Sequence, residues 1–394
     1  MYKISNPFCP NCGSGETIKK GSQGDRKRFF CENCLRSFSV FHGRKRSVFW
    51  VPHIDGVPFR KLGDEFKLSG AEAYKIVMAE FRKLPDNTDL TQKFCDPKKF
   101  SGILVLDGKF VKVAEYKNRI PFIYGVDYLT HDIPVALLAK SESHIAFTEI
   151  FVQLKKCNYP LKVVVCDDRL AIASALKKAY PFAKIQLCQN HYLENIRRFI
   201  SFRTDEKYHH FFASLQMHVF QDPLEGRQII EALRYMLDTY GKEDEKVRAI
   251  IEDINKRKEV LFQYASIPNC PKDTNLIELY NSHIQARLKS IKGFQNFQAA
   301  KRWLNAYLIR RRTKTLTDCE YKFKHLNGFP PLHWSISESV SWPKILGVRP
   351  VENSVAPDGV KENLPQVDLP TVKFSVPNIQ TAGFSTQKNS NLTS

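Results

Sequence analysis

The hydrophobic residues between about 101 and 200 alternate between strand and helix patterns. Three β-rich segments come first, divided by turn residues: "GILVLDGKFVKVAEY", "IPFIYGVDYLT" and "IPVALLAK". An amphipathic helix is predicted from about Ser143 to Lys156. The apolar run "LKVVVCDD" is typical of a buried strand, and after it come the helix "LAIASALKKAY", the strand "AKIQLC" and a helix through "YLENIRRFI". The order β-β-β-α-β-α-β-α predicts an α/β fold with helices packed on a mixed sheet.

Helical spacing continues beyond residue 200. Residues from about 202 to 270 lose strand character, and "EGRQIIEALRYMLDTY" and "EDEKVRAIIEDINKRKEVLFQYA" are the clearest helices there. Another helix is predicted in "TNLIELYNSHIQARLKSIKGF", where it is broken by Gly293. Residues 345–394 are rich in Pro, Ser, Asn and Thr, with few large apolar residues. We expect this last segment to be a disordered tail.

Two short helices are predicted between residues 50 and 90. Their apolar positions follow helical spacing, first at Phe59, Leu62 and Phe66 and then at Tyr74, Val77, Met78 and Phe81. Ser69 followed by Glu72 is a capping box that starts the second helix. Two such helices with a Gly-containing turn are typical of a helix-turn-helix, although an ordinary helical hairpin has a similar sequence. We expect residues 50–90 to be a helix-turn-helix DNA-binding domain.

Four of the ten cysteines form two pairs near the start of the chain, Cys9 with Cys12 and Cys31 with Cys34. This double Cys-x-x-Cys spacing lets four thiolates surround one Zn²⁺ ion. A module of this size buries little apolar surface, so a structural metal would supply folding free energy. A redox role is the alternative, but no βαβ pattern surrounds the pairs. We therefore expect a zinc ribbon over residues 1–45.

The chain is strongly basic, with 60 Lys and Arg against 41 acidic residues and a formal charge of +19. This balance favours a polyanionic partner over a merely cationic surface. Two basic clusters are candidate DNA-binding sites: Arg44, Lys45 and Arg46, and Arg310, Arg311 and Arg312. No apolar run is long enough to cross a membrane and no leader pattern is present, so we expect a cytoplasmic, nucleoid-associated protein without a membrane partner.

Three carboxylates occupy positions that suggest catalysis. Asp107 ends the first apolar strand, Asp167 ends "VVVCDD", and Glu278 lies on the late helix. Acidic groups at the ends of buried strands are costly to desolvate, so a cation between them is expected. Oxygen ligands select Mg²⁺ or Mn²⁺, and two such ions can serve phosphodiester chemistry. The alternative is that Asp107 belongs to a "DG" hairpin turn and Glu278 to a solvated helix face.

Two further features of the sequence leave alternatives open. Because side chains alternate along a strand, Asp167 and Asp168 cannot both face one metal, and the apolar residues before them do not decide between the two. In "CQNH", Cys188 and His191 face the same way if a helix has begun. They could be a metal pair, but a packed thiol beside a hydrogen-bonded imidazole is the commoner arrangement.

The chain resembles a known family through three blocks, "VLDGKFVKV", "VVVCDDRLAIASALKKAYPFAKIQLCQNH" and "TNLIELYNSHIQARLKSIKGF". They are similar to the catalytic blocks of DDE transposases of bacterial insertion sequences, in the Mutator-related group with Cys-x-x-His after the second aspartate. The zinc ribbon and helix-turn-helix look like the DNA-binding portion that many such enzymes carry.

The resemblance implies an RNase H-like catalytic domain over residues 98–325, with a helical insertion at about 202–270. Asp107, Asp167 and Glu278 match the catalytic, metal-binding triad, with Cys188 and His191 as the accessory pair. The family usually has glycine after the second aspartate, where this chain has Asp168.

The activity that the resemblance implies is cleavage of element ends and joining of the 3′-hydroxyl to target DNA, with Mg²⁺ or Mn²⁺ as cofactor. Double-stranded DNA and further copies of the chain are the implied partners. A non-catalytic DNA-binding regulator and a nuclease on the same fold are the alternatives.

Overall fold

A computed structural model of the chain describes residues 7–23, 26–41, 48–221, 226–242, 244–340 and 346. They fall within one compact unit, Met1–Pro350. Arg44, Lys45 and Arg46 lie outside the described residues, as does the expected tail apart from Leu346. In the described part of the chain, no helix is both long and apolar enough to cross a membrane.

The N-terminal module is a three-stranded antiparallel sheet in the order β1-β2-β3. Its strands are β1 (Thr17–Gln23), β2 (Arg26–Cys31) and β3 (Ser37–Phe41). Its apolar interior is small, and it includes the stacked pair Phe29 and Phe38. A second source of stability is therefore expected in this module, as the sequence indicated.

A group of short helices follows: α1 (Trp50–Asp55), α2 (Phe59–Glu65), α3 (Gly70–Phe81) and α4 (Asn87–Phe94). The predicted capping box is confirmed at the start of α3. Ser69 Oγ accepts a hydrogen bond from Glu72 N, and Glu72 Oε2 accepts one from Ser69 N. Leu62, Val77 and Phe81 are buried between the helices, as the helical spacing predicts, whereas Tyr74 of the same predicted set is exposed.

The central sheet has five strands in the order β6-β5-β4-β7-β8. They are β4 (Ile103–Val111), β5 (Ile120–Asp127), β6 (Val135–Leu138), β7 (Val163–Cys166) and β8 (Lys184–Leu187). The first three in chain order pair antiparallel, whereas β7 and β8 add in parallel to β4. The predicted α/β fold and the RNase H-like mixed sheet are therefore confirmed.

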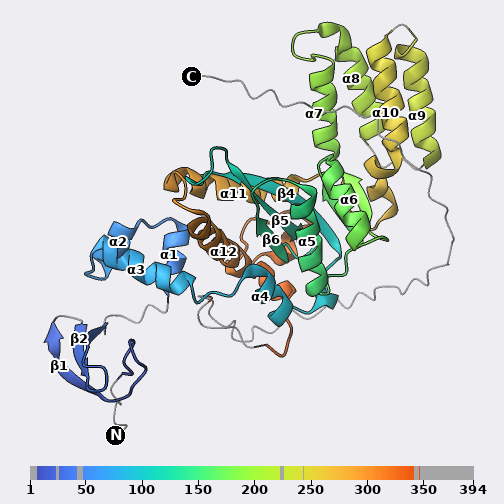
Figure 1. The fold of residues 1–394 in the computed structure, drawn as a ribbon. Helices are drawn as coiled ribbons and strands as arrows, with labels where there is room; N and C mark the ends of the chain where they lie inside the picture. Colours follow the sequence, from blue (N-terminus) through green and yellow to red (C-terminus); the bar gives the residue numbers. More distant parts are fainter. Residues whose placement is uncertain are drawn as a thin grey trace. The chain divides into compact units, whose positions relative to one another are not determined.

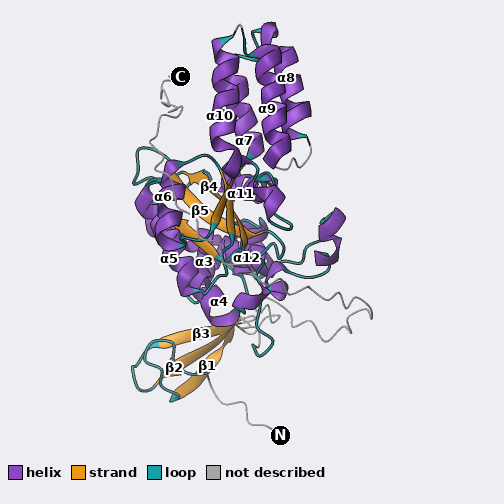
Figure 2. Ribbon diagram, turned by 90° about the vertical axis from the view of Figure 1, so that its right-hand side faces the viewer, coloured by secondary structure: helices purple, strands orange, loops and turns teal. Residues whose placement is uncertain are grey.

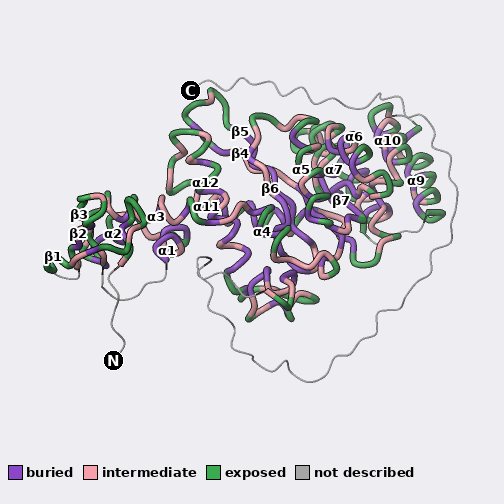
Figure 3. The backbone as a smooth tube through the Cα atoms, turned by 60° about the horizontal axis from the view of Figure 1, so that its bottom comes forward, coloured by how far each residue is buried: buried purple, intermediate pink, exposed green. Residues whose placement is uncertain are grey.

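Helices cover both faces of this sheet, and the strands are largely buried (Figures 1 and 3). One face packs on α5 (His144–Lys156) and α6 (Leu170–Ala179), through even-numbered residues such as Leu104 and Val164. The other face packs on α11 (Asn275–Ile291) and α12 (Phe297–Thr313), through odd-numbered residues such as Val105 and Val165. Along β4 and β7, even-numbered side chains therefore face α5 and α6, and odd-numbered side chains face α11 and α12.

Between β8 and α11 the chain forms α-helices that lie side by side (Figures 1 and 2). They are α7 (Gln189–Phe199), α8 (His209–Leu215), α9 (Gly226–Tyr240) and α10 (Glu245–Leu261), with a π-helical turn at Gln216–Phe220. They share a core that includes Phe212, Met236 and Ile254. Short 3-10 turns lie at Pro97–Lys99, Glu206–Tyr208, Gln263–Ser266, Tyr321–Leu326 and Pro331–Trp334.

One expectation about β4 is wrong. Asp107 does not end its strand, and the following glycine does not form a hairpin turn, because β4 continues to Val111. Gly108 pairs with Ile123 in the ladder between β4 and β5. Long-range pairing with β5 therefore overrides the local turn signal of "DG".

Candidate active site and candidate metal centre

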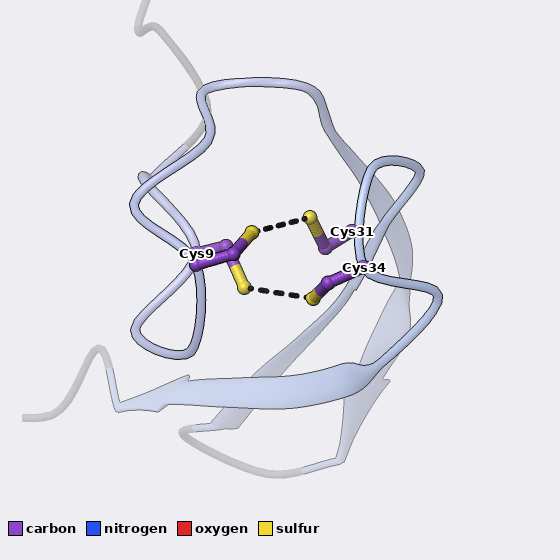
Figure 4. A group of neighbouring side chains, drawn as sticks. Cys9, Cys31 and Cys34 are labelled. Carbon is purple, nitrogen blue, oxygen red and sulfur yellow. Dashed lines mark hydrogen bonds between the residues drawn. The ribbon is translucent and has the colours of Figure 1, made fainter.

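The four N-terminal cysteines converge on one point between two loops (Figure 4). Cys9 Sγ lies 3.6 Å from Cys34 Sγ, and Cys12 Sγ lies 3.5 Å from Cys31 Sγ. All four sulfur atoms lie within 4.8 Å of one another. Four thiolates at about 2.3 Å from a tetrahedral Zn²⁺ are separated by roughly 3.8 Å. The donor set and its spacing therefore fit a structural zinc ion.

Asp107 is held by α11, the helix that also carries Glu278. Asn281 Nδ2 donates a 2.6 Å hydrogen bond to Asp107 Oδ2, and Asn281 Oδ1 accepts one of 2.8 Å from the buried Tyr124 hydroxyl. Burial raises the pKa of Asp107 to about 6, and the charge of Asp167 acts in the same direction. A carboxylate desolvated in this way would be stabilised by a cation.

His191, in the first turn of α7, lies between the other two carboxylates. Its Nδ1 is 2.5 Å from Asp167 Oδ1, and its Nε2 is 3.8 Å from Glu278 Oε1. The contact with Asp167 is the largest cause of a raised His191 pKa, about 11. The imidazolium therefore links Asp167 to Glu278 and offsets part of their mutual repulsion.

Thr274, directly before α11, joins Glu278 to the accessory pair. Its hydroxyl lies 3.1 Å from Glu278 Oε1, 3.2 Å from Cys188 Sγ and 3.4 Å from His191 Nδ1. The sequence reasoning missed Thr274 and Asn281. Two features of the sequence could have indicated them. Thr is a common residue type directly before a helix, as at Thr274, and Asn281 follows Glu278 by one turn on the same helix face.

Cys188 immediately precedes α7, so the helix has begun at His191 and the two side chains face the same way, as the sequence suggested. Together with Asp167 they present ligand atoms within 4.8 Å of one another. Two ligands of one tetrahedral Zn²⁺ stay about 3.3 Å apart, which is longer than the 2.5 Å between His191 and Asp167. The arrangement therefore fits an imidazole bonded to a carboxylate beside a packed thiol.

Asp167 and Asp168 have different partners, as strand alternation requires. Asp167 continues the odd-numbered positions of β7, which face α11, and it meets His191. Asp168 instead forms an ion pair with Arg257 of α10. Of the two neighbours, Asp167 lies with the other predicted carboxylates.

The three predicted carboxylates thus come together from β4, the end of β7 and the first turn of α11. Glu278 and Asp167 share His191, while Asp107 binds a residue one helical turn beyond Glu278. Side chains of Asp167 and Glu278 are 27% and 46% exposed, so solvent reaches the group. Hard carboxylate oxygens around a desolvated acid suit Mg²⁺ or Mn²⁺.

One part of the predicted DNA-binding set is wrong. Arg312 is completely buried, where it forms an ion pair with Asp132 at 2.7 Å and binds the Asn87 carbonyl oxygen and Thr91 Oγ1. Its guanidinium therefore cannot reach DNA in this fold. Arg310 pairs with Asp55 at 2.6 Å, and Arg311 lies over the Tyr280 ring. For these two arginines, contact with DNA stays a prediction.

Comparison with known proteins gives a family match over the central part of the chain. The model of the Mutator family of transposases matches residues 103–314, more than half of the chain. The matched segment contains Asp107, Asp167 and Glu278 together with the accessory pair.

Two similar relatives are transposases for insertion sequence element IS256 in transposon Tn4001, from Staphylococcus aureus and Enterococcus faecalis. Each is 27% identical over 189 residues, which cover 44% of this chain and 44% of the relative. The match therefore spans less than half the length of these relatives.

Among solved structures, the Drosophila P element transposase strand transfer complex is 13% identical with a TM-score of 0.33, covering 72% of this chain and 95% of that one. The Mos1 transposase paired-end complex is 12% identical with a TM-score of 0.17, covering 55% and 75%.

Proposed function

Because the chain belongs to the Mutator family of transposases, we propose that it binds the ends of a mobile DNA element, cleaves them and joins the freed 3′-hydroxyl to target DNA. The observation that carries the proposal is the convergence of Asp107, Asp167 and Glu278 from three separate elements. A protein that only bound DNA would gain nothing from desolvating Asp107 beside another carboxylate.

In this proposal the three carboxylates hold Mg²⁺ or Mn²⁺. The ions would supply charge that activates the attacking oxygen of water or of the 3′-hydroxyl and that stabilises the departing oxygen. Asn281 fixes Asp107 Oδ2 and so orients this carboxylate for a metal. Thr274 orients Glu278, and His191 balances the charge of Asp167 and Glu278.

The remaining modules would position the DNA. We assign residues 1–45 to a zinc ribbon, residues 50–90 to a helix-turn-helix, and residues 98–325 to the catalytic domain with its insertion at about 202–270. Tyr74 and Lys75 on the exposed side of α3 are the side chains this helix could present to a groove. Joining two element ends would take at least two copies of the chain.

The test is a strand-transfer assay with the purified full chain, Mg²⁺, a target plasmid and duplexes carrying the inverted repeats that flank the gene. Joined products support the proposal. Cut products without joining indicate a nuclease, and a shifted band with neither indicates a DNA-binding regulator. Asp107→Asn and Glu278→Gln should abolish both steps but keep DNA binding. Glu149→Gln, an exposed change on α5 across the sheet, is the matched control and should behave as wild type.

A further inference from the structure

The β4–β5 hairpin is fixed to the turn between α11 and α12. Val113 forms a parallel bridge with Phe294. Phe294 N donates to the Lys112 carbonyl at 2.9 Å, and Ala114 N donates to the Phe294 carbonyl at 2.8 Å. Phe297 N, at the start of α12, donates to Glu115 Oε2 at 2.8 Å. Two segments far apart in sequence therefore form one rigid end.

This end is basic. Its exposed cations come from the hairpin and from the end of α11, and they are Lys112, Lys117, Arg119, Lys289 and Lys292. None of them forms an ion pair with another residue that the structure describes. The nearby Glu115 is engaged by the backbone of α12. We call these five side chains the basic end.

The basic end lies at a defined distance from the candidate catalytic carboxylates. β4 and α11 lie beside one another (Figure 1). The Asn281–Asp107 hydrogen bond joins them, and the bridge between Val113 and Phe294 joins the chain just beyond their ends. Lys112 is the first residue after β4 and follows Asp107 by five residues of extended chain, about 16 Å at 3.3 Å per residue. The helical path from Asn281 to Lys292 is also about 16 Å, at 1.5 Å per residue.

On the premise of the proposed function, we propose that the basic end binds backbone phosphates of duplex DNA about five base pairs from the scissile phosphate. The spacing follows because base pairs rise 3.4 Å along duplex DNA, so 16 Å corresponds to about five. Unpaired, exposed lysines on a rigid support suit phosphate oxygens, and they read no base sequence. The contact therefore holds DNA in register with the carboxylates.

The test uses fluorescent duplexes that keep the same element end and extend either 2 or 10 base pairs past the scissile phosphate into the flanking DNA. Binding to the full chain is measured over a range of salt concentrations, without Mg²⁺ so that no cleavage occurs. The variant is Lys112→Ala with Lys289→Ala and Lys292→Ala. The matched control removes Lys156, Lys177 and Lys178, exposed lysines on α5 and α6 at the opposite face of the sheet.

We expect wild type and control to bind the long duplex at least about tenfold more tightly than the short one, and the variant to lose this preference. The logarithmic salt slope on the long duplex should fall by about 2 to 3 in the variant only, since each neutralised phosphate contributes about 0.9. An unchanged preference or slope in the variant, or no length preference in wild type, overturns the proposal.

These outcomes are separate from those of the proposed function. Length-dependent binding without any strand transfer would contradict the proposed transposase activity but still support the phosphate contact. Strand transfer by the wild type, together with wild-type DNA binding by the lysine variant, would contradict the phosphate contact alone. Because all three lysines are exposed, the variant should unfold at the wild-type temperature, which a thermal melt checks.

Discussion

Asn281 and Asp107 are joined by a 2.6 Å hydrogen bond between helix α11 and strand β4, and the hydroxyl of Tyr124 holds the asparagine in place. Replacing Asn281 by Ala should leave Asp107 free to turn and the buried Tyr124 hydroxyl without this partner. We expect strand-transfer activity to fall about 10- to 100-fold, the usual effect of losing a group that orients a metal ligand. The Mg²⁺ concentration for half-maximal activity should rise.

The Mg²⁺ titration separates positioning from general damage to the fold. Tyr124→Phe keeps the ring and should show a smaller rise in the same direction, while Asn255→Ala on the exposed side of α10 should show none. An Asn281→Ala variant that loses activity with an unchanged Mg²⁺ requirement would contradict the assigned role.

Neighbouring Asp167 and Asp168 should differ sharply when each is changed to Asn. Asp167→Asn should remove strand transfer to below detection, because a lost metal carboxylate costs several kcal/mol in the transition state. Asp168→Asn should keep activity within a few-fold of wild type. It loses an ion pair with Arg257, which still has Asp253 at 3.0 Å, so the stability cost is about 1 kcal/mol or less. The reverse order of activities would assign the metal to Asp168.

The strand and helix order was predictable because it depends on local patterns. Buried strands such as β7 are continuous apolar runs, and the capping box at Ser69 is a feature of four residues. The choice between Asp167 and Asp168 was not predictable, because both faces of β7 are apolar. Only the packing of α11 on the odd-numbered face distinguishes them.

The expectation for Arg312 was wrong for the same reason: the packing that buries it cannot be read from the local sequence. Three consecutive arginines appear as one basic cluster in sequence, but successive residues of a helix point in directions about 100° apart. One of them had to face the interior, and its partner Asp132 is far away along the chain. Charge alone could not reveal a buried ion pair.

Arg312→Ala should destabilise the fold and should not act through DNA contact. It leaves Asp132 buried without its cation, for which we expect a loss of about 3 to 5 kcal/mol in the free energy of unfolding. Urea unfolding at pH 7 measures this loss. The salt slope of DNA binding, measured where the variant is still folded, should stay at the wild-type value. Arg302→Ala, an exposed change on the same helix, should leave stability unchanged. If the Arg312→Ala protein were as stable as wild type and its DNA binding had a flatter salt slope, Arg312 would instead be a DNA-binding residue.

His131 should contribute to the pH dependence of stability. Burial lowers its pKa to about 4, with His325 and Arg311 acting in the same direction. Its unfolded-state pKa is about 6.5, so the unfolded chain binds the extra proton first as pH falls. The stability that neutral His131 provides is therefore complete above pH 6.5 and is lost towards pH 4. The total is on the order of 3 kcal/mol.

The variant that checks this is His131→Asn, because position 131 has a φ of 58° and Asn tolerates that conformation better than most residues. Chemical unfolding of both proteins at pH 7.5 and pH 4.5 gives the change in free energy over that interval. The loss on acidification should be smaller in the variant by a few kcal/mol. Equal losses in the two proteins would mean that His131 is already protonated in the fold or exposed to solvent.

Zinc should be needed only by the N-terminal module. The four thiol sulfurs already stand at 3.5–3.6 Å in pairs, so binding requires deprotonation but little rearrangement. We expect one Zn²⁺ per chain by elemental analysis, and none after Cys34→Ser, whereas Cys319→Ser should retain it. A chelator should expose residues 7–41 to protease and leave the central sheet and the helices packed on it resistant, because the central sheet has its own apolar core. Wild-type protein that carries no zinc and keeps a protease-resistant N-terminal sheet would show that the four cysteines are not a metal site.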